Sequence, residues 1–570
     1  MNSANAGEKT IGRGRLFTAA IFLCLFFLYF WQLGAAGLID PDEGRYAEIP
    51  REMIERGDYV TPRLAGLKYF EKPVLTYWLT AASFHLFGQN EFGARFPAAA
   101  SALLGIAATW LLAKRRYGRD TADWSAIVLG SSFLYFVIGR IILTDMVLSA
   151  FQTIAFAAAG LALTETSSRK LRLSIFFAAM GLSVLAKGLI GLVLPGGALL
   201  LYALLSRNLG AFALFARFLP GYAIFALVTV PWFWAVASRN QDFLSFFFIH
   251  EHFLRYVTTI HQRSEPFWFF APVLIAGFVP WTGFLPSAFT DAIRAAKTAI
   301  RGKNGQSFEL FLLCWSFFIF AFFSLSGSKL IPYITPALPP VAIMTAVSFH
   351  RRMELRSLRG STALNCLFLL LLATAFATLR HYFRDGSYDL DAAYPVGMVI
   401  ALSMLLLSIA FALCAFRPRP EPGRRLLYLS LALFLMTFYP VHSIVASGKS
   451  VADLCFLLNE LEARGLGPSR DYAIAAYREF PQGVQFYLKK RPILVEYTGE
   501  LAFGREAEPD VAEGYFQSED EFVKRLDVKR EQDIVLVIEN RNILRLPEGI
   551  RRRATIMASG FNFTALRLRK

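Results

Sequence analysis

Residues 394–416 read YPVGMVIALSMLLLSIAFALCAF, 23 positions without a charged side chain. A helix of that length covers the roughly 30 Å of hydrocarbon in a lipid bilayer. Comparable apolar blocks recur along the whole chain. They lie at about 16–34, 92–113, 121–139, 143–164, 172–187, 189–206, 214–237, 266–290, 308–326, 330–348, 362–380, 394–416 and 426–446. The sequence therefore predicts a polytopic α-helical membrane protein with about thirteen transmembrane helices.

The composition agrees with this fold class. Hydrophobic residues make up 55% of the chain and charged residues only 18%, whereas a soluble protein averages about a quarter charged residues. The net charge of +16 lies mostly in short loops between apolar blocks, which is the positive-inside pattern of membrane proteins. We therefore expect no nucleic-acid partner. The five cysteines show no CxxC spacing, so neither a disulfide framework nor a zinc–thiolate site is predicted.

Charges in the loops also predict the orientation. Basic residues precede the first apolar block, as in a signal peptide, but the block is longer than a usual signal-peptide core, which indicates an uncleaved first span with a cytoplasmic N-terminus. The later basic clusters all fall on the cytoplasmic side only if residues 73–88 lie on the membrane surface instead of crossing it. We thus expect a first periplasmic loop at about 35–91, with interfacial helices at 44–57 and 73–88.

The chain changes character after about Ser447. Charged segments there alternate with short β-rich runs at 472–477, 493–497 and 534–538, and with helix-like stretches at 451–462 and 518–526. This alternation predicts an α/β domain outside the membrane at 447–570, following a transmembrane domain at 1–446; the resemblance described below implies that the first is periplasmic and the second catalytic. The C-terminal region shows no catalytic motif of its own.

Two acids stand at expected periplasmic ends of helices. Asp42 follows Pro41 at the start of the first interfacial helix, and Asp145 follows Thr144 at the start of an apolar block. Each is a suitable helix cap. Each is also suited to act as a carboxylate in a substrate cavity, because charges beside a bilayer are costly unless they are paired or functional. The sequence leaves both interpretations open.

Several cations are expected at the same membrane face. Lys187 interrupts a long apolar stretch, and Lys72, Arg255 and Lys329 lie in periplasmic loops or at span ends. A lysine in such a position can simply extend its ammonium to the interface. Cations that converge at the bilayer surface also suit a phosphate head group with its tail in the membrane.

A divalent metal site is a further hypothesis. Glu71 lies in the first loop, and His250 and His252 lie in a distant periplasmic loop. Zinc accepts both carboxylate and imidazole ligands. The two histidines do not share a helix face, so we expect at most one of them to join Glu71.

At these residues the chain resembles the bacterial lipid A aminoarabinose transferases, members of the GT-C class that includes protein O-mannosyltransferases. The resemblance begins in the first loop, with Asp-Pro-Asp-Glu-Gly-Arg-Tyr-Ala-Glu at 40–48 and Phe-Glu-Lys-Pro at 70–73. It continues through the segments 77–79, 95–97, 144–146, 186–188, 251–255, 328–333, 486–488 and 499–504.

The resemblance implies a function and a set of site residues. The donor would be 4-amino-4-deoxy-L-arabinose on undecaprenyl phosphate, the acceptor a lipid A phosphate, and the reaction an inverting glycosyl transfer. The enzyme would be a monomer among the lipids of the bacterial inner membrane, with a periplasmic active site. The implied residues are Asp42 and Asp145 for catalysis, Lys72, Lys187 and Arg255 for the donor phosphate, Glu43, Arg45, Tyr46, Lys329 and Tyr333 for the substrate cavity, and Glu71 with His252 or His250 for zinc or magnesium.

Two alternatives remain open from the sequence. One is a related transferase that moves a polyprenyl-phosphate-linked sugar to a protein or another glycan. The other is a transporter of lipid-linked sugars, which would place polar residues through the middle of its spans. Here the polar residues gather at one membrane face, which favours an enzyme.

Overall fold

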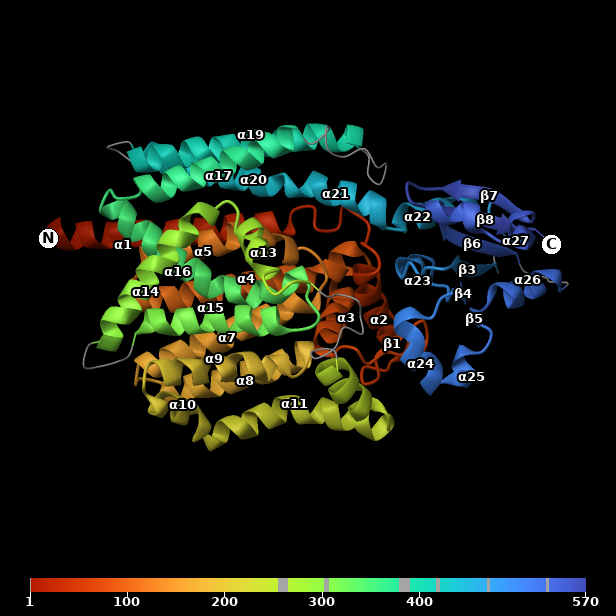
Figure 1. The fold of residues 1–570 in the computed structure, drawn as a ribbon, viewed down its shortest axis with the longest axis horizontal. Coiled ribbons are helices and arrows are strands. Elements are labelled where there is room, and N and C mark those ends of the chain that lie inside the picture. The colour runs from red at the N-terminus through yellow and green to blue at the C-terminus, as the bar shows by residue number, and fades with distance from the viewer. Residues whose placement is uncertain are drawn as a thin grey trace.

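The computed structural model describes residues 2–254, 265–301, 307–378, 390–416, 421–468, 472–528 and 533–569. Long helices with roughly parallel axes form a bundle, and a sheet-containing domain lies at one end of it (Figure 1). The N-terminal end of α1 (Asn2–Phe30) lies at the opposite end of the bundle.

Eight helices of the described ranges are long and apolar enough to cross a membrane. They are α4 (Glu91–Tyr117), α7 (Thr144–Thr164), α11 (Leu219–Arg239), α15 (Phe308–Leu325), η3 with α16 (Ile331–Glu354), α17 (Arg359–Ala377), Ala393–Phe416 within α19, and α20 with α21 (Pro422–Lys449). A bent pair, Phe270–Gly277 and Thr282–Arg301, would make a ninth. The chain is thus a multi-pass membrane protein, while the number thirteen stays a prediction.

Some expected spans are shorter or broken. The block at 121–139 forms α5 (Arg119–Ser131) and α6 (Phe133–Ile138), because Ser132 has an extended backbone. The neighbouring helices α8 (Arg169–Lys187), α9 (Ile190–Leu205) and α10 (Leu209–Ala216) follow one another closely. Gly188, with φ of +79°, allows the sharp reversal between α8 and α9.

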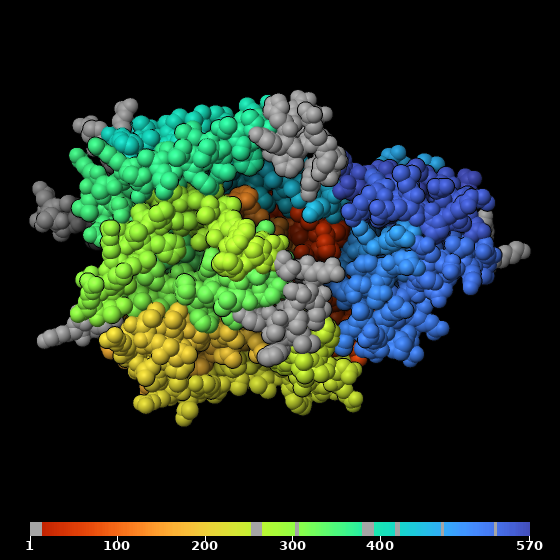
Figure 2. Space-filling model, in the orientation of Figure 1, coloured from red at the N-terminus to blue at the C-terminus, as the bar shows by residue number. Residues whose placement is uncertain are grey.

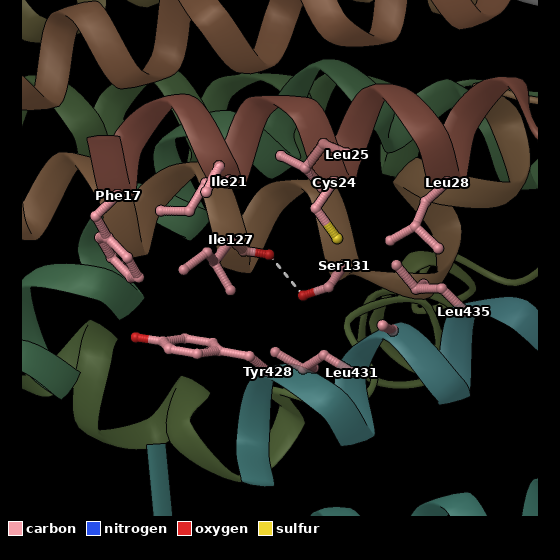
Figure 3. A pocket seen from close by; sticks show the side chains of 12 residues that line it. Phe17, Ile21, Cys24, Leu25, Leu28, Ile127, Ser131, Tyr428, Leu431 and Leu435 are labelled. Carbon is pink, nitrogen blue, oxygen red and sulfur yellow. Dashed lines mark hydrogen bonds between the residues drawn. The ribbon is translucent and has the colours of Figure 1, made fainter. Parts of the chain in front are cut away.

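The outer face of the bundle carries an apolar slot between α1, α5 and α20, with a volume of about 180 Å³ (Figure 3). Its one buried hydroxyl, that of Ser131, donates to the carbonyl of Ile127 at 2.5 Å and accepts from the indole of Trp281 at 2.9 Å. Because that hydroxyl is already hydrogen-bonded, the slot is suited to hydrocarbon.

The first loop folds across one end of the bundle. It contains α2 (Asp42–Arg56), the short hairpin β1 (Arg63–Leu64) and β2 (Leu67–Lys68), and α3 (Leu75–Phe87). The two helices agree with those expected at 44–57 and 73–88. With 15 and 13 residues, both are too short to span a bilayer.

The C-terminal domain is built on a six-stranded sheet in the order β5-β4-β3-β6-β8-β7. Strands β3, β4, β5 and β6 are parallel neighbours, whereas β8 pairs antiparallel with β6 and β7. The expected strands and helices are all present, and β5, β7 and β8 were not expected. The elements are α22 (Ala452–Ala463), β3 (Ala473–Tyr477), α23 (Gly483–Leu488), β4 (Ile493–Val495), η4 (Gly499–Leu501), α24 (Ala502–Ala507), α25 (Pro509–Ala512), β5 (Phe516–Gln517), α26 (Glu519–Asp527), β6 (Ile534–Glu539), η5 (Asn540–Arg545), α27 (Glu548–Arg551), β7 (Ala554–Ser559) and β8 (Phe563–Leu568).

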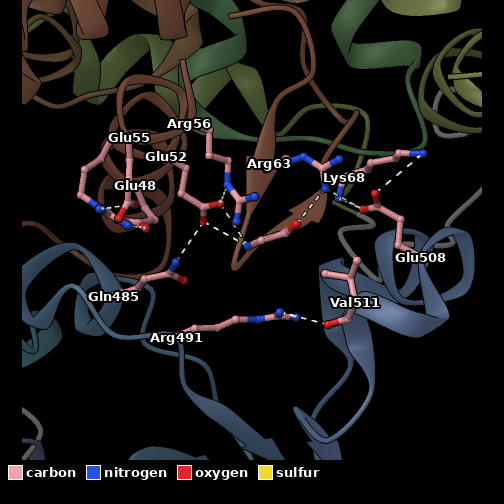
Figure 4. Close-up of polar contacts among 12 residues, drawn as sticks. Glu48, Glu52, Glu55, Arg56, Arg63, Lys68, Gln485, Arg491, Glu508 and Val511 are labelled. Carbon is pink, nitrogen blue, oxygen red and sulfur yellow. Dashed lines mark hydrogen bonds and ion pairs between the residues drawn. The ribbon is translucent and has the colours of Figure 1, made fainter. Parts of the chain in front are cut away.

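The C-terminal domain packs directly on the first loop, as Figure 2 shows for the blue and red surfaces. Figure 4 shows the polar contacts between them. The Gln485 amide donates to Glu52 at 3.0 Å, and Arg63 Nη1 donates to Glu508 at 2.9 Å. These contacts fix α2 between the membrane bundle and the sheet domain.

Candidate functional site

Neither Asp40 nor Asp42 caps α2. The N-cap position is Pro41, and no side chain makes a capping hydrogen bond. The Asp40 carboxylate instead accepts a hydrogen bond from the backbone N–H of Gly483 at 2.7 Å, so it ties the first loop to the C-terminal domain. Burial raises the pKa of Asp40 to about 7, although that hydrogen bond opposes the rise. Capping therefore does not explain why either acid is present.

Asp42 belongs to an ion-paired group that we call the loop cluster, made of Asp42, Arg45 and Glu500. The buried Arg45 guanidinium pairs with Asp42 through Nη2 and with Glu500 through Nη1. The Asp42 side chain is 56% exposed, which leaves its carboxylate accessible. The C-terminal domain thus supplies one residue of a cluster that otherwise belongs to the first loop.

Aromatic residues enclose Arg45. Its guanidinium lies 5.0 Å from the ring centre of Tyr46 and 5.9 Å from that of Tyr69. In the part of the chain that the structure describes, Arg45 Nε and the hydroxyls of Tyr69 and Tyr77 have no hydrogen-bond partner. Buried polar atoms are normally satisfied, so these three atoms are suited to contact a polar ligand.

Glu43 has a different role from its neighbours. Its carboxylate accepts from Arg95 Nε at 2.8 Å and from Arg95 Nη2 at 2.7 Å, and also from the backbone N–H of Ile142 at 3.0 Å. Burial alone would raise the pKa of Glu43, but the ion pair with Arg95 outweighs burial and lowers that pKa. The sequence predicted Glu43 to line the cavity, but its contacts join α2 to α4 and to the segment before α7.

A second group, the helix cluster, consists of Asp145, Lys187 and Tyr333. Asp145 lies in the first turn of α7 and pairs with Lys187, the last residue of α8. Both side chains are less than a tenth exposed, so Lys187 does not extend to solvent. The Lys187 ammonium lies 4.5 Å from the ring centre of Tyr333 in η3 (Ile331–Ala337). No side chain caps α7, so Asp145 is not a cap either.

The two clusters are neighbours. Burial raises the pKa of Tyr46, and the nearby carboxylates of Asp42, Glu71 and Asp145 raise it further. Tyr46 therefore lies within electrostatic reach of acids from both clusters. Asp42, Glu71 and Asp145, three of the acids that the sequence placed at one membrane face, therefore lie near this residue.

Two further acids meet at one cation. Lys72 Nζ lies 3.7 Å from Glu71 and 3.8 Å from Glu251, which is buried in the π-helical segment η1 (Ser245–Leu254). His250 Nδ1 lies 3.5 Å from Glu251. The side chain of His252 and the whole of Arg255 lie outside the described residues. Among the described side chains, no three His, Cys, Asp or Glu residues are placed to hold a metal ion.

Lys329 lies in the turn before η3. It is 7% exposed, and its ammonium donates to the carbonyl of Ser326 at 2.7 Å. From η3 itself, Ile334 and Ala337 line an apolar hollow of about 430 Å³ bounded by α9, α13 (Phe270–Gly277), α14 (Leu285–Arg301) and α15. The same short helix η3 thus lines this hollow and carries Tyr333 of the helix cluster.

Sequence reasoning assigned no role to three residues of this region: Arg95, Glu500 and Tyr69. Arg95 and Glu500 did lie in segments that carried the family resemblance. Their partners lie 52 and 455 positions away in the chain, and nothing in the local pattern indicates those pairings.

Comparisons with known proteins identify the family. Residues 16–247 match the model of dolichyl-phosphate-mannose-protein mannosyltransferases, and residues 467–547 match the aminoarabinose transferase C-terminal domain. The undecaprenyl phosphate-alpha-4-amino-4-deoxy-L-arabinose arabinosyl transferase of Serratia proteamaculans is 31% identical, over 91% of this chain and 93% of that protein. The chain belongs to this family of glycosyltransferases. The arabinosyl transferase of Pectobacterium atrosepticum is 30% identical, over 92% of this chain and 93% of that protein.

Solved structures of the arabinosyl transferase family show the same fold. ArnT from Cupriavidus metallidurans, in the apo state, superposes with a TM-score of 0.81 at 28% identity and covers 98% of both chains. A second structure of that protein, bound to undecaprenyl phosphate, matches equally well. The GT-C fold expected from the sequence is therefore confirmed.

Proposed function

We propose that this protein transfers 4-amino-4-deoxy-L-arabinose from undecaprenyl phosphate to a phosphate of lipid A. The reaction takes place at the periplasmic face of the bacterial inner membrane, and the enzyme acts as a monomer. The observation that carries this proposal is the pair of ion-paired clusters near Tyr46, together with an apolar hollow lined by η3, the element that carries Tyr333, in a chain of the arabinosyl transferase family. The clusters suit phosphate and amino-sugar groups, and the hollow suits a polyprenyl tail.

The donor phosphate would bind at the helix cluster. Lys187 is already paired with Asp145, so a bound phosphate would either share the Lys187 ammonium with Asp145 or replace Asp145 as its partner. Asp145 is then placed to pair with the cationic amino group of the donor sugar. Lys72 and Arg255 would add positive charge to the same phosphate, and Lys329 and Tyr333 would line the cavity. These cations stabilise the negative charge that grows on the leaving phosphate.

The acceptor would bind at the loop cluster. A lipid A phosphate oxygen attacks the anomeric carbon, the bond between that carbon and the donor phosphate oxygen breaks, and undecaprenyl phosphate leaves with the electron pair. Arg45 and Tyr46 would hold the acceptor. The exposed Asp42 carboxylate would orient it and take the proton of a monoprotonated phosphate. Glu43 positions these residues through its contacts with Arg95.

A divalent cation, zinc or magnesium, is a proposed cofactor. Glu71 and Glu251 both approach the Lys72 ammonium, which shows that this point favours positive charge. Glu71, with His252 or His250, would hold the ion, and Glu251 is an added candidate ligand. When bound, the ion would supply positive charge near the phosphates. Metal analysis of the purified protein and of Glu71→Ala tests this proposal directly, without an activity readout.

Mass spectrometry of lipid A tests the function. Cells that carry the protein should show lipid A heavier by one aminopentose, and cells without it should not. Lys72→Ala should lower the product by about one to two decades, since a charge-assisted phosphate contact contributes roughly 1.5–3 kcal/mol. Lys68→Ala is a matched control outside the clusters. Unmodified lipid A in cells that express the folded protein and supply the donor would overturn the proposal.

A further inference from the structure

A cavity of about 800 Å³ lies far from the clusters described above. The loop after α7, the first turn of α8 and the segment from α10 to Phe218 line it. Figure 1 shows α10 at the end of the bundle remote from the C-terminal domain. Helix α7 carries Asp145 in its first turn and ends 19 residues later, at Thr164, beside this cavity, so the two sites lie about 30 Å apart across the membrane.

The cavity is strongly basic. Arg169, Lys170 and Arg217 line it, and no acidic side chain does. Arg169 Nε donates to the carbonyl of Ala162 at 3.1 Å, which fixes the guanidinium at the rim. The nearest acid in the loop, Glu165, is already paired with Arg172. The cavity thus concentrates three cations whose charge no lining residue balances.

The same cavity has an apolar side. Leu173, Leu214 and Phe218 form part of its wall. Beside it, Leu171, Leu209 and Leu219 are 61%, 63% and 75% exposed on the outer surface of the bundle. A ligand that fits this place has an anionic head and long apolar chains.

We propose that this cavity binds an anionic phospholipid of the cytoplasmic leaflet. Its phosphate lies among Arg169, Lys170 and Arg217, and its acyl chains follow Leu171, Leu209 and Leu219. The positive-inside pattern places this end of the bundle at the cytoplasmic face. Basic pockets between membrane helices on that side are suited to anionic lipid head groups. A free phosphate ion would leave the apolar wall and the exposed leucines uncovered.

The test is native mass spectrometry of the full-length protein purified in detergent and titrated with phosphatidylglycerol or phosphatidylcholine of identical acyl chains. The wild type should bind phosphatidylglycerol more tightly. The triple variant Arg169→Gln, Lys170→Gln, Arg217→Gln should lose this preference, because its affinity for phosphatidylglycerol should fall about fivefold for each cation removed. The matched control is Arg294→Gln, Lys297→Gln, Arg301→Gln on α14, three exposed cations at the same end of the bundle.

Clear outcomes overturn the proposal. The proposal is wrong if the wild type binds the two lipids with equal affinity. It is also wrong if the control variant loses as much affinity for phosphatidylglycerol as the triple variant. Displacement of the bound lipid by millimolar inorganic phosphate would show that the site recognises the ion alone. If the triple variant does not fold, the exposed single variant Arg217→Gln decides, with about a fivefold loss expected.

Discussion

The loop cluster and the helix cluster both pair a carboxylate with a cation, but they are held in different ways. Asp145 and Lys187 are buried and lie at the ends of two packed membrane helices. Asp42 is exposed, and its partner Arg45 depends on Glu500 from a separate domain. The helix cluster is therefore coupled to the stability of the bundle. The loop cluster can lose function while the bundle stays intact.

The largest effect is expected from Lys187→Met. This change leaves the Asp145 carboxylate buried without its cation, which costs about 3–5 kcal/mol of stability. Thermal unfolding of the purified protein measures it. The double variant Asp145→Asn, Lys187→Met should recover most of the stability and stay inactive, because both charges are gone. A single variant as stable as the wild type would contradict the buried ion pair.

Asp42→Asn should leave stability within about 0.5 kcal/mol of the wild type, because the side chain is exposed. Its turnover should fall by about a hundredfold or more, since the amide keeps the shape of the side chain but loses its charge and basicity. Transfer assays with purified donor and acceptor measure the rate. Glu55→Gln, at another exposed position on α2, is the control and should keep full activity. Near-normal turnover of Asp42→Asn would remove Asp42 from the mechanism.

Glu500→Gln tests whether the C-terminal domain takes part in the site. The variant weakens the Arg45 ion pair, and turnover should fall by about tenfold. Glu508→Gln breaks a contact of the same domain with Arg63, outside the loop cluster, and should have little effect on the rate. Equal losses in both variants would indicate that the domain acts only through docking.

The smallest effect concerns Asp40 and pH. Its pKa of about 7 in the folded protein lies above the ordinary value of 3.8, so the fold favours the protonated acid. Its stabilising contribution is full below about pH 4 and is lost as the pH rises through 7. The Tm of Asp40→Asn minus the Tm of the wild type should thus be about 1–2 °C larger at pH 8 than at pH 5. A Tm difference that is the same at both pH values would show that Asp40 does not titrate in this way.

The comparison also shows what the sequence could predict. The apolar blocks, the two interfacial helices and the strands at 472–477, 493–497 and 534–538 follow from local patterns. Charge in the loops placed Asp42, Asp145 and Lys187 at one membrane face. The pairing of Arg95 with Glu43, and of Arg45 with Glu500, depends on tertiary contacts between distant segments. The exposed residues of β7 lack the alternation that marks a half-buried strand, so that strand was not expected.

The contact between Arg45 and Glu500 also sets the timing of enzyme maturation. The two residues are 455 positions apart, and Asp40 and Gly483 are 443 positions apart. At about 5–20 residues per second, a ribosome needs roughly 20 to 90 seconds to make the chain between them. During that interval the first loop has already been synthesised, but its ion-pair partner does not yet exist. Each new enzyme molecule therefore passes through an immature stage that ends only when the last domain has been made and has folded onto the loop.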